Sequence, residues 1–290
     1  MTTNSLYTIG GCTLRLTGPA LEEAVSAIPG FQPFRSKSQF PELFRIQYVY
    51  GQEIPASVEK LYDFNHGGIH TTFFTTENGY ALHMQQEQGQ ELHLWCDTDR
   101  KVFNLQGDLL PILLRFAIWI AYGLATVKYG RLALHSSCIV NHGKAYIFLG
   151  ESGTGKSTHT HLWRVHIPGS QLLNDDCPIL SVEADGIWMY GSPWSGKTPC
   201  YRAERYRLGG CIRLSQAPQN HMERLNVFKA FAALHPSCPP QFVRNELLSN
   251  EICKSLNTIL SKIPVYHLAC LPDTAAAHLS YQTLCGPFSL

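Results

Sequence analysis

The stretch Gly150–Ser157, with the sequence GESGTGKS, matches the pattern G-x-x-x-x-G-K-S of a phosphate-binding loop. An apolar run, Ala145–Leu149, comes directly before it, and a helix can begin at Lys156. A strand, a glycine-rich loop and a helix N-terminus in this order direct several backbone N–H groups at one anion. We expect Lys156 to reach the β- and γ-phosphates and the Ser157 hydroxyl to bind Mg²⁺. The pattern therefore predicts a nucleoside triphosphate site, against the alternative of a glycine-rich turn without a ligand.

The composition is that of a globular chain with little overall charge. Its 290 residues suffice for one large domain or two ordinary ones, and 44% hydrophobic against 16% charged residues excludes a disordered chain. The formal net charge of +1 provides no field that would recruit nucleic acid or an anionic membrane. The ten cysteines are scattered singly, without the paired spacing of zinc sites. Because Met1–Gly18 lacks a secretory pattern, we expect reduced thiols and a cytoplasmic location.

One apolar stretch, Leu109–Val127, is nearly long enough to cross a bilayer. Arg115 lies near its middle, where a charge is costly in hydrocarbon. Pro111 lies near its start, where a helix tolerates proline. We therefore expect a buried core helix and no membrane span.

Residues 1–105 have the pattern of a β-rich N-terminal domain of unknown role. Turn-like segments separate its strand-like ones, and a short helix is predicted at Leu21–Ile28. Strand-like runs lie within Tyr7–Leu16 and Leu43–Tyr50, and the short predicted strands that follow them are Ile69–Thr76, Tyr80–Gln85, Glu91–Asp97 and Arg100–Leu105. The last four predict an antiparallel meander. The histidines here share no metal-ligand spacing, so we expect them to be solvated or structurally paired: His66, His70, His83 and His93.

Residues 106–290 are expected to form the second domain, of the mixed α/β class. The strand that enters the loop is predicted to be one arm of a hairpin, with its turn at Asn141–Lys144 and its other arm within Leu132–Val140. The remaining predicted elements are a second hairpin (Pro178–Glu183 and Ile187–Gly191), the helices Asn226–Leu234, Val243–Ser261 and Thr274–Leu284, and the strand Val265–Leu271. Consecutive hairpins around the loop predict a mixed, largely antiparallel sheet, because parallel sheets are built from helical crossovers.

Two further groups of residues are candidates for the chemistry. Asp175 and Asp176 follow an apolar pair, and carboxylates at a strand end opposite a phosphate loop are the usual second anchor for Mg²⁺. One of them can hold the metal while the other accepts a proton from an attacking hydroxyl; the alternative is a plain turn. His135 precedes the loop on the predicted hairpin partner, where it can orient an aspartate or serve only the fold.

These residues together resemble the catalytic domain of the HPr kinase/phosphorylase family, which shares its fold with ATP-dependent phosphoenolpyruvate carboxykinase. The resemblance rests on a strand histidine (His135), the loop GESGTGKST and the run Leu-Asn-Asp-Asp, and it covers residues 105–290. It implies that Ser157 and Asp176 hold Mg²⁺, and that Asp175, assisted by His135, is the base for the acceptor hydroxyl. The residues implied to bind ATP are Gly150, Glu151, Ser152, Gly153, Thr154, Gly155, Lys156, Ser157 and Thr158.

The chain departs from the family pattern at two places that concern the acceptor. Ser136 follows the histidine where the family has glycine, and the family's downstream Arg-Gly signature is replaced by the loop Gly191–Thr198. Trp194 and Lys197 on that loop are expected to cover the phosphates, with Lys197 replacing the missing arginine. A basic cluster follows and suits an anionic acceptor or a solvated face: Lys197, Arg202, Arg205, Arg207 and Arg213. Because of these departures, the chain resembles the wider group of HPr-kinase-like proteins encoded beside bacterial peptide-modification genes more than it resembles the kinases that act on HPr itself.

The sequence therefore predicts a cytoplasmic, ATP- and Mg²⁺-dependent kinase. It would transfer the γ-phosphoryl group to a hydroxyl, serine first, of a protein, peptide or small molecule, with no nucleic acid or membrane partner. Two alternatives stay open: a phosphoenolpyruvate carboxykinase-like enzyme, for which His159, His161 and His166 offer metal ligands, and a non-catalytic nucleotide-binding sensor. The acceptor, the oligomeric state, including a homo-oligomer, and phosphorolysis are left open by the sequence.

Overall fold

Each of two mixed nine-stranded sheets organises one unit of the chain in the computed structural model, which describes residues 4–36 and 41–286. Unit 1 comprises Met1–Lys128 and Pro240–Asn250, and unit 2 comprises Tyr129–Pro239 and Glu251–Leu290. The predicted boundary at residue 105 is therefore corrected to residue 128. The reason is packing: the apolar helix α2 (Pro111–Thr126) lies against strands of the first sheet and belongs with them.

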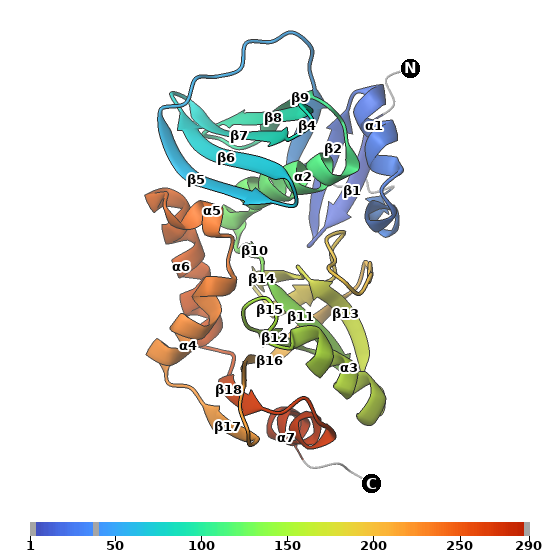
Figure 1. Ribbon diagram of the computed structural model, residues 1–290, viewed down its shortest axis with the longest axis vertical. Helices are drawn as coiled ribbons and strands as arrows, with labels where there is room; N and C mark the ends of the chain where they lie inside the picture. Colours follow the sequence, from blue (N-terminus) through green and yellow to red (C-terminus); the bar gives the residue numbers. More distant parts are fainter. Residues whose placement is uncertain (1–3, 37–40, 287–290) are drawn as a thin grey trace. The chain divides into compact units, whose positions relative to one another are not determined.

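Unit 1 consists of a strongly bent β-sheet and the helices that cover its apolar side (Figure 1). Its elements are β1 (Asn4–Ile9), β2 (Cys12–Thr17), α1 (Pro19–Ser26), η1 (Pro29–Phe34), β3 (Arg35–Ser36), β4 (Phe44–Tyr48), β5 (Glu59–His66), β6 (Ile69–Thr76), β7 (Gly79–Gln86), β8 (Glu91–Asp97), β9 (Val102–Gly107), α2 and α5 (Pro240–Val243). The strand order is β3-β1-β2-β4-β9-β8-β7-β6-β5. Strands β5 to β9 form the predicted antiparallel meander, although β5 was not predicted, and β4 pairs in parallel with both β2 and β9.

The core of unit 1 lies between this sheet and α2. Leu94 and Phe103 on the sheet and Ile120 and Leu124 on α2 are buried around the same interior space. Phe242 of α5 reaches the same core, because its ring packs against Phe73 at 5.9 Å between ring centroids. One helical segment, Pro111–Tyr129, is long and apolar enough to cross a membrane, and 67% of its apolar window is buried in the fold. This agrees with the expected core helix.

Unit 2 has its sheet order as β10-β14-β15-β16-β12-β11-β13, with β18 pairing to β16 and β17 to β18. Its elements are η2 (Val127–Tyr129, at the boundary), β10 (Arg131–Ala133), β11 (Ser136–Asn141), β12 (Lys144–Leu149), α3 (Lys156–His166), β13 (Gln171–Asp176), β14 (Ile179–Glu183), β15 (Gly186–Tyr190), β16 (Arg205–Gln216), β17 (His221–Arg224), α4 (Val227–Leu234), η3 (His235–Ser237), β18 (Val265–Cys270) and α7 (Thr274–Cys285). Helix α6 (Glu246–Leu260) contributes its first residues to unit 1 and the rest to unit 2. Both predicted hairpins are present, as β11–β12 and β14–β15.

Two features of this sheet differ from the sequence prediction. The strand expected at Leu132–Val140 is broken into β10 and β11, which pair with different neighbours. The long strand β16 was not predicted, and it lies in parallel beside β12, next to the loop.

The turn between β11 and β12 needs positive φ at His142 (46°) and Gly143 (71°), which a short Asn-His-Gly-Lys segment can supply.

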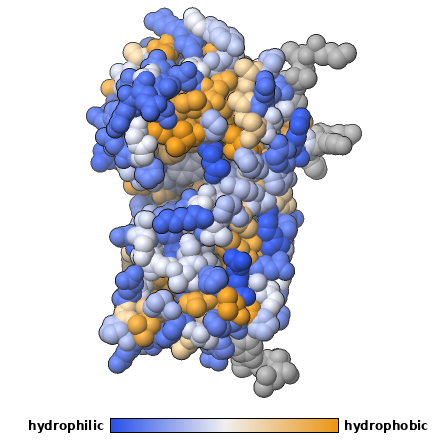
Figure 2. Space-filling view, turned by 45° about the vertical axis from the view of Figure 1, so that its right-hand side comes forward, coloured by the Kyte–Doolittle hydropathy of each residue, from blue (hydrophilic) through white to orange (hydrophobic). Residues whose placement is uncertain are grey.

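The core of unit 2 forms where α3 and α7 lie side by side against the sheet (Figure 1). Phe148, Trp163, Ile212 and Tyr281 belong to one buried apolar cluster. On the face seen in Figure 2, apolar residues gather in each unit among hydrophilic ones. The core therefore fixes α3, and with it the loop before α3, against strands β12, β11 and β13 at one end of the sheet.

Candidate nucleotide-binding site

The loop between β12 and α3 adopts a backbone conformation that its glycines permit. Gly150, Gly153 and Gly155 have φ angles of 152°, 85° and 101°. A Cβ on Gly150 would lie 2.4 Å from the Thr154 hydroxyl, so a larger residue does not fit there. The loop enters directly from a buried strand and leads into the N-terminus of α3. This is the strand, loop and helix arrangement that binds an anion with backbone N–H groups.

Lys156 lies across the mouth of the loop. Its Nζ atom donates to the carbonyl oxygens of Gly150 at 2.8 Å and Glu151 at 3.1 Å. The side chain is buried, and burial lowers the pKa of Lys156, while the nearby Asp176 and Asp175 oppose that shift. The ammonium group is therefore held on loop carbonyls that phosphate oxygens can replace.

Asp175 is buried directly beneath the start of α3. Its Oδ1 atom accepts hydrogen bonds from the hydroxyls of Ser157 at 3.0 Å and Ser137 at 2.7 Å. Its Oδ2 atom is buried and has no hydrogen-bond partner among the described residues. A buried carboxylate oxygen without a partner is costly, and a bound cation or its water would relieve that cost.

The structure thus pairs Ser157 with Asp175, whereas the resemblance paired it with Asp176. The strand register explains the difference. Ser137 on β11 lies opposite Asp175 on β13, and both side chains point to the face that α3 covers. Successive residues of a strand point to opposite faces, so the side chains of Asp175 and Asp176 point in different directions, although both carboxylates act electrostatically on Lys156.

Asp176 lies instead beside His135, at the exposed end of β13. The His135 Nε2 and Asp176 Oδ1 atoms are 3.7 Å apart, and both side chains are about half exposed. Asp176 has φ of 126°, a conformation that only glycine adopts without strain. Burial, followed by the charge of Lys156, lowers the pKa of His135, while Asp176 raises it. The predicted contact of His135 with Asp175 is therefore replaced by one with Asp176.

The loop Gly191–Thr198 is attached to this aspartate pair. The Gly196 N–H donates to the Asp175 carbonyl at 2.5 Å, and the Ser195 hydroxyl donates to the same oxygen at 3.2 Å. Lys197 is exposed on the loop directly after these contacts. Trp194 is 5% exposed, and its carbonyl accepts from the Asn174 side chain at 3.0 Å. The expectation that Trp194 covers the phosphates is corrected, because this residue is buried in the base of the loop.

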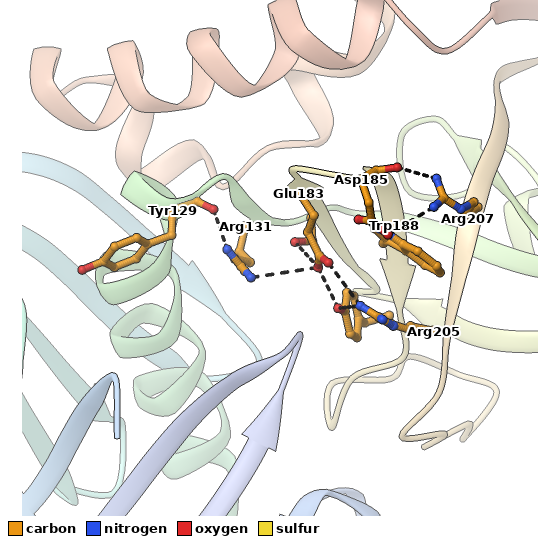
Figure 3. Close-up of polar contacts among 9 residues, drawn as sticks. Tyr129, Arg131, Glu183, Asp185, Trp188, Arg205 and Arg207 are labelled. Atoms are coloured by element: carbon orange, nitrogen blue, oxygen red, sulfur yellow. Dashed lines mark hydrogen bonds and ion pairs between the residues drawn. The ribbon is translucent and has the colours of Figure 1, made fainter. Parts of the chain in front are cut away.

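The basic cluster predicted from the sequence is neutralised by carboxylates over much of its length (Figure 3). Arg205 pairs with Glu183 and Arg207 with Asp185, both at 3.1 Å. The two guanidinium groups also lie over the Trp188 ring, at 4.3 and 4.6 Å from its centroid. The Arg205 and Arg207 charges are paired with carboxylates of β14 and of the β14–β15 turn, which weakens the interpretation of this cluster as an anion site.

The position of β16 separates these arginines from the loop. Arg207 lies opposite Lys144, at the start of β12, and Arg213 lies opposite Leu149, at its end. Six residues of strand correspond to about 20 Å. Arg213 is therefore the arginine beside the loop, and its guanidinium is 3.7 Å from the Glu151 carboxylate. The sequence alone could not single out Arg213, since β16 was not recognised as the neighbour of β12.

A pocket of about 680 Å³ adjoins the loop and the N-terminal half of α3. Its apolar walls include Leu162 on α3 and Leu214 on β16, and its polar lining includes Gln216. The Gln216 amide donates to the Gly153 carbonyl at 3.3 Å and so joins the pocket to the loop. The pocket has apolar walls with a few polar groups, which suits a planar nucleobase.

His159 has a structural place behind the loop. It is 3% exposed, and its Nε2 atom lies 2.9 Å from the Ser280 hydroxyl of α7. Trp163 donates to the same hydroxyl at 2.7 Å. Burial lowers the pKa of His159 to about 4, so the ring is neutral near pH 7. His159 therefore does not support the second metal site of the carboxykinase alternative.

No protein-family model matches this chain, and no curated protein sequence matches it significantly.

Proposed function

We propose that this chain is a cytoplasmic ATP-dependent kinase that transfers the γ-phosphoryl group to a hydroxyl, serine first. The observation that supports this best is the contact between the Ser157 hydroxyl and buried Asp175 behind a G-x-x-x-x-G-K-S loop. Phosphate loops of this kind use the serine and a strand-end aspartate around Mg²⁺. The geometry adds a second carboxylate, a histidine and a lysine on the exposed side of the same strand end.

Mg²⁺ and the triphosphate have suitable donors here. Ser157 Oγ and the unpartnered Oδ2 atom of Asp175 are hard oxygen ligands, which Mg²⁺ prefers. When bound, Mg²⁺ would neutralise the charge that develops on the phosphate oxygens during transfer. Lys156 would exchange the carbonyls of Gly150 and Glu151 for phosphate oxygens. The roles that the resemblance assigned to Asp175 and Asp176 are thereby exchanged.

The proton chemistry falls to Asp176 and His135. The acceptor oxygen attacks the γ-phosphorus, the bond from that phosphorus to the β–γ bridging oxygen breaks, and ADP leaves. The hydroxyl proton passes to the Asp176 carboxylate, which His135 orients at 3.7 Å. Lys197 would approach the transferring group from the loop that is bound to the Asp175 backbone. A base at this exposed strand end is accessible to a serine side chain as well as to a small molecule.

The nucleoside is expected in the pocket beside Leu162, Leu214 and Gln216. The hydrophobic walls would favour stacking of a nucleobase, and Gln216 would offer hydrogen bonds to the edge of that base. This arrangement supports a nucleoside triphosphate over a simple phosphate ester as the ligand.

The proposal is tested with the full chain, Mg²⁺ and ATP labelled in the γ-phosphate. Calorimetry measures ATP binding, and transfer of label into candidate hydroxyl compounds, peptides and cell lysate measures activity. Lys156→Ala should weaken ATP binding by at least ~2 kcal/mol, because it removes a charge-assisted contact. Lys144→Ala, at the opposite end of β12, is the matched control and should bind normally. Equal ATP affinity in parent and Lys156→Ala rejects the site, whereas ATP binding without any transfer favours a nucleotide sensor.

A further inference from the structure

A second polar cluster lies in unit 1, on adjacent strands of the antiparallel meander. His83 on β7 and His93 on β8 are direct cross-strand partners. Their rings are stacked, with centroids 4.4 Å apart and an interplanar angle of 3°. Glu91 lies two residues before His93, so it projects from the same face of the sheet. Three potential metal ligands therefore meet at one point of the fold.

The ligand atoms of this His83–Glu91–His93 cluster have suitable separations. The Glu91 Oε2 atom is 3.4 Å from His83 Nε2 and 3.5 Å from His93 Nε2. Ligands about 2.0 to 2.1 Å from a tetrahedral Zn²⁺ are about 3.3 Å from one another. All three ligand atoms lie within 4.8 Å of one another. Two edges of a zinc tetrahedron are thus nearly formed, and the two rings must turn out of their parallel stacking before both Nε2 lone pairs can point at one ion.

The surroundings favour a ligand at this point. The His83 Nε2 atom is buried and makes no hydrogen bond to any described residue. The His93 side chain is 13% exposed and lies opposite Gln106. The Gln106 side-chain amide accepts a hydrogen bond from the Gln52 N–H and donates one to the Gln52 carbonyl. Glu91 is half exposed, so the cluster is supported on one side and open to solvent on the other. A buried imidazole nitrogen without a hydrogen-bond partner is a polar atom that a cation would satisfy.

We propose that His83, Glu91 and His93 form a binding site for a divalent transition metal, Zn²⁺ first. Two imidazoles and one carboxylate are a common zinc ligand set, and they leave a fourth position for water. Nitrogen-rich ligands disfavour Mg²⁺ and Ca²⁺, so this site differs in chemistry from the loop site of unit 2. Bound metal would connect β7 and β8 at the middle of the meander. It would therefore stabilise unit 1 independently of ATP.

The experiment uses the full chain, freed of metal by a chelator and titrated with Zn²⁺ against a chromophoric competitor. Parent protein should bind Zn²⁺ at a site that His83→Ala and His93→Ala each weaken by ~100-fold or more, because each removes one of three protein ligands. Glu91→Gln, at a half-exposed position, should weaken it by at least ~10-fold without removing core packing. His70→Ala is the matched control, since this exposed histidine lies on the neighbouring strand and pairs with Asp63. It should bind Zn²⁺ as the parent does.

Two measurements distinguish loss of the site from loss of the fold. Circular dichroism and melting in chelator should be the same for parent and Glu91→Gln, and added Zn²⁺ should raise the melting temperature of the parent more than that of Glu91→Gln. X-ray absorption of the zinc-loaded parent should show two imidazole ligands. Absence of Zn²⁺ binding by the parent overturns the proposal. Equal affinity in the parent and all three variants overturns it as well, because the metal would then be bound elsewhere, as at the cysteines.

Discussion

The Gly150–Ser157 loop and the His83–Glu91–His93 cluster collect polar groups for ligands of opposite charge. The loop combines a glycine-rich backbone at the N-terminus of α3 with the Lys156 ammonium, which favours an anion. The cluster presents two imidazole nitrogens and a carboxylate within 4.8 Å, which favours a cation. The loop is positioned by α3 and its buried core, whereas the cluster is positioned by the pairing of β7 with β8. The same fold class thus supports both kinds of site, by helix packing in one unit and strand register in the other.

The carboxylates of the two regions differ in the same way. Asp175 is buried, with one oxygen bound by two serine hydroxyls and the other unpartnered. Glu91 is half exposed beside two histidines. Burial of Asp175 makes the loop region costly to assemble without its ligand, whereas water can hydrate the half-exposed Glu91 carboxylate when no metal is bound.

The largest expected effect is on turnover, at the exposed carboxylate of the loop region. Asp176→Asn should lower kcat by ~10³-fold with little change in ATP affinity, because it removes the proton acceptor. Asp175→Asn should instead weaken Mg²⁺-dependent nucleotide binding. Steady-state kinetics and calorimetry separate the two. If Asp175→Asn alone lost turnover with normal binding, the exchange of roles would be wrong.

The strain at Asp176 supplies a control for that experiment. Asp176→Gly relieves a φ of 126° and should raise the free energy of unfolding by about 1 kcal/mol while removing turnover. Urea unfolding measures the first effect. A destabilised glycine variant would show that the side chain of Asp176 serves the fold.

The next effect concerns the buried histidine behind the loop, in contrast with the paired histidines of unit 1. His159 has a folded-state pKa of about 4, below its ordinary value of 6.5, so the unfolded chain binds the proton more tightly. The contribution of the neutral His159 ring to the free energy of unfolding is fully present above pH 6.5. As the pH falls from 6.5 toward 4, this contribution decreases by about 3 kcal/mol.

Urea unfolding at pH 7 and at pH 4.5 measures this loss. His159→Gln should be less stable than the parent at pH 7 and should show a smaller decrease between the two pH values. His221→Gln, at an exposed position, is the control and should follow the parent. The same decrease in the parent and His159→Gln would mean that other groups cause the acid destabilisation.

A smaller effect is expected at Lys197, the exposed cation of the loop region. Lys197→Ala should lower kcat by ~10²-fold and leave ATP affinity unchanged, because the contact develops only with the transferring phosphoryl group. Lys197→Arg should restore part of the rate. Unchanged kcat in the alanine variant would return the role to Arg213, the arginine that lies beside the loop.

The smallest expected effect is the absence of coupling between the two sites. The sites share no residue and belong to different units. His93→Ala should therefore change ATP affinity by less than about 2-fold, and Lys156→Ala should change Zn²⁺ affinity equally little. Paired titrations of both variants measure this. A larger effect in either direction would show that metal in unit 1 regulates the loop.

Local sequence patterns determined much of the fold. The glycine spacing of Gly150–Ser157, both hairpins and the apolar helix at Pro111–Thr126 were predictable, because neighbouring residues set turns and helix periodicity. The β-rich character of the first region was predictable for the same reason. The domain boundary was placed too early, since the packing of α2 against the first sheet leaves no local signal.

The tertiary structure alone decided which residues meet. Long-range pairing placed β16 beside β12, which left Arg205 and Arg207 remote from the loop and Arg213 beside it. The register of β13 against β11 directs the Asp175 side chain, and not that of Asp176, toward the Ser157 hydroxyl. The register of β7 and β8 joined His83 with His93, although ten positions separate them in the chain. Strand order and register depend on contacts distant in sequence, so residue spacing cannot reveal them.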